Sequence, residues 1–122
     1  MSGEKRRKAY LWGHGAESLA VMLLRLKGFS ILAKRYAASG GEIDIIARRK
    51  NLIVFVEVKA RSELDVAREA ITPQKVQRMS KAARAFLGRY RGAQNCAWRG
   101  DAVFLAPWKL PRHVPGAFEL LI

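Results

Sequence analysis

The sequence predicts one α/β domain with a central mixed β-sheet flanked by helices. Its 122 residues match the length of a single domain. Half of the residues are hydrophobic and 27% are charged, which is typical of a globular protein and not of a disordered or collagen-like chain. A helical pattern at 73–90 lies between strand patterns at 52–59 and 98–105. Such a connection permits a right-handed crossover to a parallel strand, so we expect a mixed sheet with a helix on each face.

The first predicted helix covers residues 15–27. Its apolar face is expected to be formed by leucines at helical spacing, which are Leu19, Leu23 and Leu26. Gly28 is placed to cap the C-terminus of this helix. A strand is then expected at 29–36, followed by a turn at 38–41 that ends in two glycines.

Two strand patterns follow, at 42–47 and 52–59, separated by the polar residues 48–51. Four polar residues between two β-rich runs favour an antiparallel hairpin with a four-residue loop. The run from Leu52 to Val56 is apolar at every position. We therefore expect the second strand to be central and covered on both faces.

A second helix is predicted from Pro73 to Tyr90, with Thr72 as its N-cap and the proline in its first turn. A short turn is expected before it, near 65–70. Two further strands are expected at 98–105 and 118–122, with a proline-interrupted loop between them. The core face of the helix is predicted to consist of Val76, Met79, Ala83, Phe86, Leu87 and Tyr90.

Charge is the strongest compositional signal, because 23 Lys and Arg against 10 Asp and Glu leave a net charge of +13. A polyanionic partner is expected, with nucleic acid first and an anionic membrane surface or ribosomal RNA as alternatives. Basic residues cluster at the hairpin tip, after the second hairpin strand and along the second helix. The predicted phosphate contacts are Arg48, Arg49, Lys50, Arg61, Lys75, Arg78, Lys81 and Arg84.

The single cysteine, Cys96, cannot form an internal disulfide and is expected to be a small buried side chain, as suits a reducing cytoplasm. No stretch approaches the roughly 18 apolar residues of a membrane-spanning helix, and the basic start does not lead into an uninterrupted signal core. We therefore expect a cytoplasmic protein without a membrane segment. The domain is expected to span 1–122, with 1–10 as a basic, flexible N-terminus.

The hairpin carries the residues that suggest chemistry. If 48–51 form the whole loop, Asp44 lies opposite Phe55 and Glu42 lies opposite Glu57. Alternating side chains then place Glu42, Asp44, Glu57 and Lys59 on one face. Asp44 and Glu57 become diagonal neighbours with backbones about 7–8 Å apart, a span that two carboxylates can bridge through one cation.

A carboxylate on the covered strand, with a second carboxylate on the neighbouring strand, predicts a bound Mg²⁺ or Mn²⁺, because hard oxygen ligands suit these ions and unpaired buried charge is costly. Lys59 is then placed to orient a water or to stabilise developing negative charge. The alternative is a solvated strand end, where Glu57 and Lys59 form an ordinary ion pair. The combination with Asp44 favours the metal site.

Other candidates have two readings each. Glu17 either interacts with the dipole of the first helix or supplies a third carboxylate to the site, and the residues alone do not decide between them. Glu42 is expected to support Glu57 from outside the ligand set. His14 is either a loop residue or a substrate contact. Trp12 and Trp98 can stack on bases, although core packing is favoured for Trp98.

Three segments carry a family resemblance: Gly41-Glu42-Ile43-Asp44-Ile45-Ile46-Ala47, Val54-Phe55-Val56-Glu57-Val58-Lys59-Ala60-Arg61 and Ala70-Ile71-Thr72-Pro73-Gln74-Lys75. With them the chain resembles, over roughly its whole length, the YraN-like family of predicted endonucleases. That family is similar to archaeal Holliday-junction resolvases of the PD-(D/E)xK nuclease superfamily. The resemblance implies a restriction-endonuclease-like fold.

By position, the resemblance implies Asp44 and Glu57 as metal ligands, with the Val58 carbonyl as a further ligand. It also implies Lys59 as the catalytic lysine and Glu17 as the helix carboxylate. Ile43 stands where the superfamily pattern has proline, as in many relatives. The implied activity is Mg²⁺- or Mn²⁺-dependent hydrolysis of DNA, with branched DNA in repair or recombination among the implied substrates. The resolvases act as two-fold dimers, so a homodimer is also implied.

Two other functions remain open from the sequence. A nucleic-acid-binding module that keeps the fold without turnover predicts binding that does not depend on Mg²⁺. A ribosome-associated or membrane-surface basic protein predicts a preference for ribosomal RNA or anionic lipid over DNA.

Overall fold

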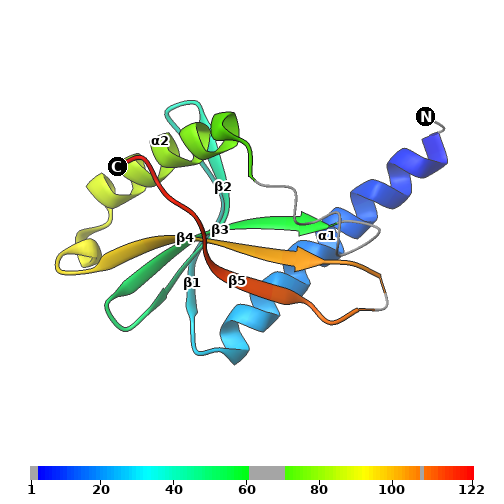
Figure 1. Cartoon of the computed structure of the whole chain (residues 1–122), viewed down its shortest axis with the longest axis horizontal. Coiled ribbons are helices and arrows are strands. Elements are labelled where there is room, and N and C mark those ends of the chain that lie inside the picture. The colour runs from blue at the N-terminus through cyan, green and yellow to red at the C-terminus, as the bar shows by residue number, and fades with distance from the viewer. Residues whose placement is uncertain (1–2, 61–70, 108) are drawn as a thin grey trace.

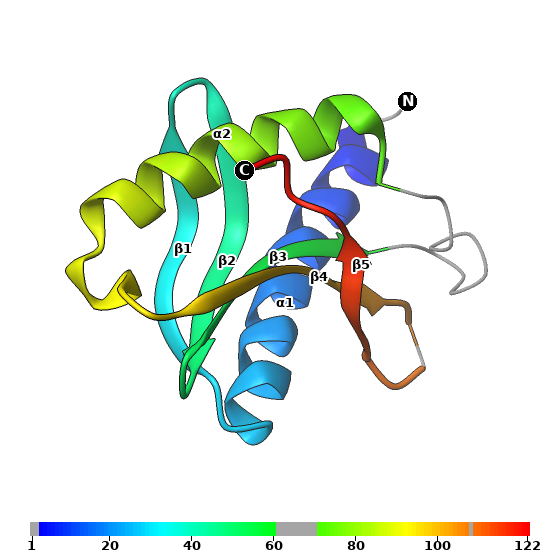
Figure 2. The same ribbon diagram turned by 60° about the vertical axis from the view of Figure 1, so that its left-hand side comes forward.

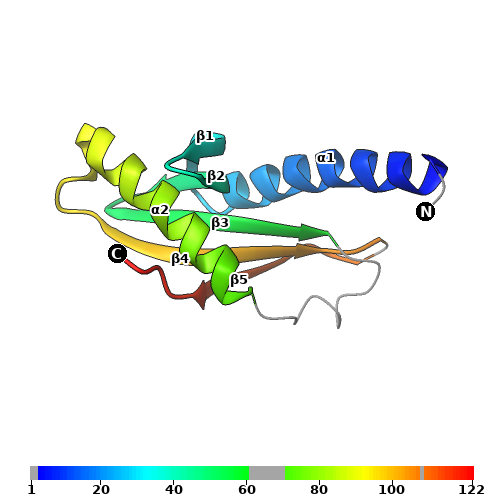
Figure 3. The same ribbon diagram turned by 90° about the horizontal axis from the view of Figure 1, so that it is seen from above.

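A computed structural model of the chain describes residues 3–60, 71–107 and 109–122, with side chains described from residue 15 onward (Figure 1). In chain order the elements are α1 (Gly3–Leu26), β1 (Ser30–Ala38), β2 (Gly41–Arg49), β3 (Leu52–Ala60), α2 (Pro73–Arg89), the short 3-10 helix η2 (Arg91–Ala93), β4 (Ala97–Leu105) and β5 (Arg112–Phe118). The N-terminal turns of α1 project beyond the sheet (Figures 1 and 3).

Within the described ranges the strands form one sheet in the order β1-β2-β3-β4-β5. β3 and β4 are parallel and are joined through α2, whereas the other neighbouring strands are antiparallel. The predicted α/β fold with a central mixed sheet flanked by helices is confirmed. This architecture is consistent with a restriction-endonuclease-like core.

The two helices cover opposite faces of the sheet (Figure 2). Val54 and Val56 of β3 pack in the cluster that contains α1, while Ile53 and Phe55 pack in the cluster that contains α2. β3 is therefore central and buried on both sides, as its uninterrupted apolar run predicts.

Helix α1 begins at Gly3 and not at residue 15. Of its predicted apolar face, Leu23 packs against the core, but Leu19 and Leu26 are wrong, since Leu26 is 80% exposed and Leu19 is exposed as well. The buried positions are instead mostly small side chains one step around the helix, namely Ala16, Ala20, Val21 and Leu24. Small residues let the helix approach the sheet closely, and spacing alone does not choose between two stripes of similar period. The cap at Gly28 is confirmed, with φ of +90°.

The predicted four-residue hairpin loop is wrong. β2 runs through Arg49, so only Lys50 and Asn51 form the turn, and Lys50 has φ of +54°. The register pairs Ile45 with Val56, two positions away from the expected pairing. The polarity of Arg48 and Arg49 predicts a loop position for both residues. In the strand, the Arg49 guanidinium instead lies 4.5 Å from the ring centre of Phe29, where its long side chain finds an aromatic surface.

Some predictions for the second half of the chain are confirmed and others are wrong. Helix α2 begins as predicted, with the Thr72 hydroxyl accepting a hydrogen bond from the Lys75 N–H at 3.2 Å. The prediction of the last strand at 118–122 is wrong, since β5 ends at Phe118. It contains Pro115, which an edge strand tolerates. Cys96 is buried as expected, but Trp98 is 46% exposed and not a core residue. Within the predicted face of α2, Met79, Ala83 and Phe86 are buried.

The predicted turn near 65–70 lies outside the described residues. None of the helices in the described ranges combines the length and apolarity needed to cross a bilayer.

Candidate functional site

A fork between β2 and β3 brings two carboxylates together. The backbone pairing of these strands reaches Ile45 and Val56. Beyond that point β2 continues beside β1, and β3 continues beside β4 as far as Ala60. At the opening of the fork, Asp44 Oδ2 accepts a hydrogen bond from the Val58 N–H at 2.8 Å. The side chain of Asp44 thus takes over the acceptor role where the ladder ends, next to Glu57.

Burial makes both carboxyl groups reluctant to ionise. Burial and, after it, the charge of the neighbouring Asp44 carboxylate together raise the pKa of Glu57 to about 7. Burial also raises the pKa of Asp44, against the opposing effect of the Val58 N–H. Glu57 Oε2 is buried and has no hydrogen-bond partner. When both carboxyl groups are ionised, the surrounding hydrogen-bond donors therefore do not fully compensate their negative charge.

Two lysines, Lys75 and Lys59, act on the Glu57 carboxylate through their positive charges. Lys75 Nζ of α2 lies 3.6 Å from Glu57 Oε1, and its charge also lowers the pKa of Asp44. Lys59, two residues along β3, lowers the pKa of Glu57 through its charge. Lys75 was predicted as a phosphate contact, but in this structure it is the counter-ion of Glu57.

Glu17 stands at the margin of the pair. Its Oε2 lies 2.9 Å from Arg35 Nε, and its charge raises the pKa of Asp44. Because α1 begins at Gly3, Glu17 is several turns from the helix N-terminus, so the predicted alternative of a dipole interaction is wrong. The structure places Glu17 beside the carboxylate pair and holds it through Arg35.

The residues of the fork suit a hard divalent cation. In the part of the chain that the structure describes, no group of three or more His, Cys, Asp and Glu side chains is arranged to hold a metal. Mg²⁺ and Mn²⁺ do not need such a group, because Mg²⁺ in particular keeps several waters and takes only one or two protein carboxylates. The orphaned Glu57 oxygen beside Asp44 is the observation that fits this chemistry.

Comparison with known proteins places the chain in a family. The model of UPF0102, described as an uncharacterised protein family, matches residues 16–105. The chain belongs to UPF0102. It is 50% identical over 119 residues to a UPF0102 protein of Methylobacterium nodulans, which covers 98% of this chain and 92% of the relative. It is 53% identical over 115 residues to one of Methylocella silvestris, covering 93% of each.

The UPF0102 match contains every residue of the fork, from Glu17 to Lys75. The resemblance to the YraN-like family is thereby confirmed as family membership. Names and matches of these relatives say nothing of nuclease activity, so that part remains a proposal.

The remaining predicted site residues of this UPF0102 chain do not gather at the fork. Glu42 is exposed and pairs with Ala37 of β1, so its predicted position opposite Glu57 is wrong. Arg48 donates to the Tyr90 hydroxyl and to the Gly92 carbonyl. Arg49 lies five residues of extended strand from Asp44, about 17 Å. Four predicted contacts are exposed, namely Lys50, Arg78, Lys81 and Arg84, and Arg61 lies outside the described residues.

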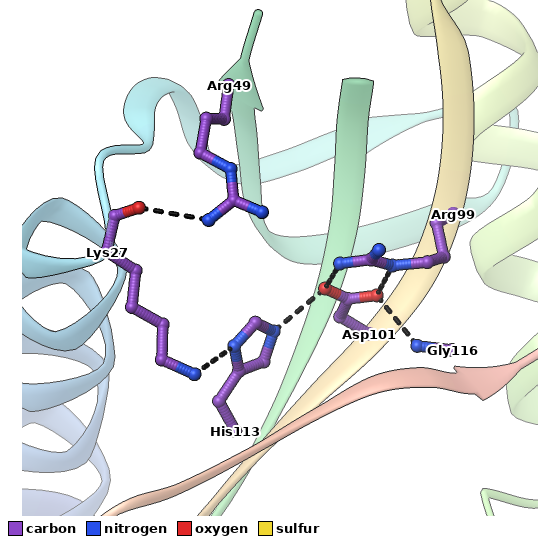
Figure 4. A network of polar contacts seen from close by, with 6 residues as sticks. All are labelled: Lys27, Arg49, Arg99, Asp101, His113 and Gly116. Atoms are coloured by element: carbon purple, nitrogen blue, oxygen red, sulfur yellow. Dashed lines mark hydrogen bonds and ion pairs between the residues drawn. The ribbon is translucent and has the colours of Figure 1, made fainter.

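A second buried carboxylate was missed by the sequence reasoning (Figure 4). Asp101 of β4 is fully buried and accepts hydrogen bonds from Arg99 Nε and Nη2 at 2.7 and 2.9 Å. It also accepts from the Gly116 N–H at 3.0 Å, and His113 Nε2 lies 2.8 Å away. These donors hold the pKa of Asp101 well below its usual range, against the effect of burial.

The network continues to the end of α1. Lys27 Nζ lies 2.8 Å from His113 Nδ1, and Arg49 donates to the Lys27 carbonyl at 3.0 Å. Asp101 pairs with Val56, whose side chain packs on the α1 face, so this network and the Glu57–Lys75 pair use opposite faces of the sheet. Arg99 and Asp101 at alternate positions of one strand were the signal available in the sequence.

Proposed function

We propose that this UPF0102 chain is a metal-dependent nuclease that hydrolyses phosphodiester bonds of DNA at the fork between β2 and β3. The observation that carries the proposal is the pair formed by the buried Glu57 and the half-buried Asp44, with one Glu57 oxygen lacking any hydrogen-bond partner. Buried, incompletely compensated carboxylates in a small domain favour a catalytic centre over a stabilising contact. The net charge of +13 supports a polyanionic substrate.

The chain's own residues have separable tasks in such a reaction. Asp44 is held in one orientation by the Val58 N–H, which fixes the direction of its other oxygen. Asp44 and Glu57 are the groups that would hold Mg²⁺ or Mn²⁺. When bound, the cation would polarise a phosphoryl oxygen and increase the acidity of water. Lys59, on the strand that carries Glu57, can orient the attacking water or stabilise charge that develops on the phosphate.

Lys75 gives the fork a cation of its own. At 3.6 Å from Glu57 Oε1 it partly neutralises the carboxylate pair, and its long side chain can turn toward a phosphate once another cation takes its place. The resemblance to resolvases supports branched DNA as one substrate form.

A second candidate function is a nucleic-acid-binding module without turnover. It is favoured by the two ion pairs at the fork, because Arg35 and Lys75 already partner Glu17 and Glu57. If these pairs persist with DNA bound, the carboxylates serve to hold cationic side chains in place.

Cleavage assays distinguish the two functions. Labelled linear, flapped and four-way DNA should be incubated with Mg²⁺ or Mn²⁺ and with wild type, Glu57→Gln or Glu119→Gln. Glu119 is exposed near the C-terminus, so its variant matches the chemical change away from the fork. We expect Glu57→Gln to lose at least 100-fold in rate and the control to keep wild-type activity. Equal residual cutting by wild type and Glu57→Gln would rule out the nuclease, and metal-independent binding would then support the module.

A further inference from the structure

We propose that the groove between α1 and β1 binds a single strand of nucleic acid and leads it to the fork. This inference rests on the nuclease function proposed above, and it names the form of substrate that the site receives. None of the predicted phosphate contacts that the structure describes lines this groove.

The groove combines cationic and apolar side chains. It has a volume of about 750 Å³ and is lined by residues of both elements. Its cations are Arg25 at the end of α1 and Lys34 and Arg35 on β1. Its apolar lining includes Met22, which is 58% exposed, and Leu26. Sites for single strands pair a positive track for phosphates with a surface for the faces of bases.

Charge favours a nucleic acid over a second copy of the chain. Among the described residues that line the groove, Glu17 is the acidic one, and its carboxylate is already paired with Arg35 at 2.9 Å. This described lining is therefore net positive, in a chain with a net charge of +13. A second copy would bring like charges together, whereas phosphates bring the complementary sign.

The exposed apolar side chains favour a single strand over a duplex. In a duplex the base faces are stacked and only phosphates, sugars and base edges reach a protein surface. In a single strand the base faces are free to lie on Met22 and Leu26, and the thioether of Met22 adapts to aromatic rings of any sequence. This assigns a use to apolar residues that the core leaves exposed.

The groove adjoins the fork, since Glu17 lines the groove and acts through its charge on Asp44. On the paired strands, Lys34 lies opposite Ile45 and Tyr36 lies opposite Ile43. Arg35 of β1 and Asp44 of β2 lie between these two pairs. Arg35 has φ of +51°, an uncommon conformation for a side chain other than glycine. Arg35 thus lies where the groove meets the carboxylates, in contrast to Arg48 and Arg49 at the other end of the hairpin.

Matched charge reversals test the groove. The affinity of a fluorescein-labelled 20-nucleotide oligothymidylate should be measured by anisotropy in EDTA, for wild type, Arg25→Glu/Lys34→Glu and the control Arg91→Glu/Lys109→Glu. Both double variants change the net charge equally at exposed positions, and only the first alters the groove. We expect at least 10-fold weaker binding for the groove variant and less than 3-fold for the control variant. Loss of two contacts should also reduce the salt slope by about 1.4.

The outcomes separate this inference from the proposed function. Equal weakening by both double variants, or an unchanged affinity in the groove variant, overturns the groove while Glu57-dependent cleavage still supports the nuclease. An equal loss on a duplex of the same length overturns the single-strand assignment. A dimer in sedimentation equilibrium that Met22→Asp dissociates would make a second copy the occupant. Circular dichroism and thermal unfolding verify that each variant is folded, and a wild type that binds no DNA and cuts none overturns both proposals.

Discussion

Asp101 and Glu57 are buried carboxylates on neighbouring strands with opposite surroundings. Asp101 accepts two hydrogen bonds from Arg99 and one from Gly116, with His113 at 2.8 Å. Glu57 has Lys75 at 3.6 Å, the Asp44 carboxyl beside it and one oxygen without a partner. The pKa of Asp101 is consequently lowered and that of Glu57 is raised to about 7.

The difference shows which carboxylate stabilises the fold and which is kept for another purpose. A buried charge with a full set of donors links the elements that supply them, here β4, β5 and, through Lys27, the end of α1 (Figure 4). A buried charge without them costs free energy of folding, so its presence points to a ligand that supplies the missing compensation.

The largest expected effect is the loss of the closed network. Asp101→Asn removes the charge that Arg99 and His113 share, and we expect urea unfolding at pH 7 to show a loss of about 3 kcal/mol. The lowered pKa fixes the pH dependence. Stabilisation by Asp101 is complete above the unfolded pKa of about 3.9 and disappears as the pH falls further, so the variants should converge in acid. A loss below about 1 kcal/mol at pH 7 would show that the network contributes little.

The next expected effect is a gain in stability on replacing Glu57, in contrast to the loss expected for Asp101→Asn. Because the folded pKa of Glu57 is raised from 4.5 to about 7, folding favours its protonated form, and its contribution to stability falls as the pH rises from about 4.5 through 7. Glu57→Gln removes this cost. In EDTA we expect the variant to be up to about 3 kcal/mol more stable than wild type at pH 8 and nearly equal at pH 4. A variant that is less stable at pH 8 would mean that Glu57 is already compensated.

The sequence was sufficient for the fold where local patterns and tertiary packing agree. The apolar run of β3 and the Thr72-Pro73 start of α2 each have one physical reading, and both were found. Leu19 and Leu26 were misassigned because a helix carries several stripes of similar spacing, and the sheet selects the one with the smallest side chains. Arg49 was misassigned because its polarity concealed a long apolar side chain that packs on Phe29.

The candidate site was predicted in composition but not in geometry. The juxtaposition of Asp44 and Glu57 was expected as a diagonal pair in a regular ladder, whereas it arises where the ladder opens. The alternation of side chains along a strand does not predict where two paired strands separate. Lys75 and Arg35 as partners of the acids, and the network of Asp101 with His113, depend on contacts between residues far apart in sequence, which no local spacing records.

The smallest of the expected effects on stability is the one from Mn²⁺ binding at the fork. If Asp44 and Glu57 together hold a divalent cation, Mn²⁺ at 100 times its dissociation constant should stabilise wild type at pH 7.5 by about 2.7 kcal/mol. Thermal unfolding should show this as a rise in Tm of several degrees, absent in Asp44→Asn. Lys75→Met is the sharper variant, because it removes the cation that competes at Glu57 and should lower the Mn²⁺ concentration needed for half of the shift.

Titration calorimetry of Mn²⁺ into the same proteins separates binding at the fork from a general effect of salt. Mn²⁺ stabilisation that is identical in wild type and Asp44→Asn would place the ion elsewhere. A Lys75→Met protein that needs more Mn²⁺ than wild type would show that Lys75 helps to form the site and does not compete for it. In the first case, the carboxylate pair would need a source of positive charge other than Mn²⁺, and an arginine or lysine of the groove would be the alternative.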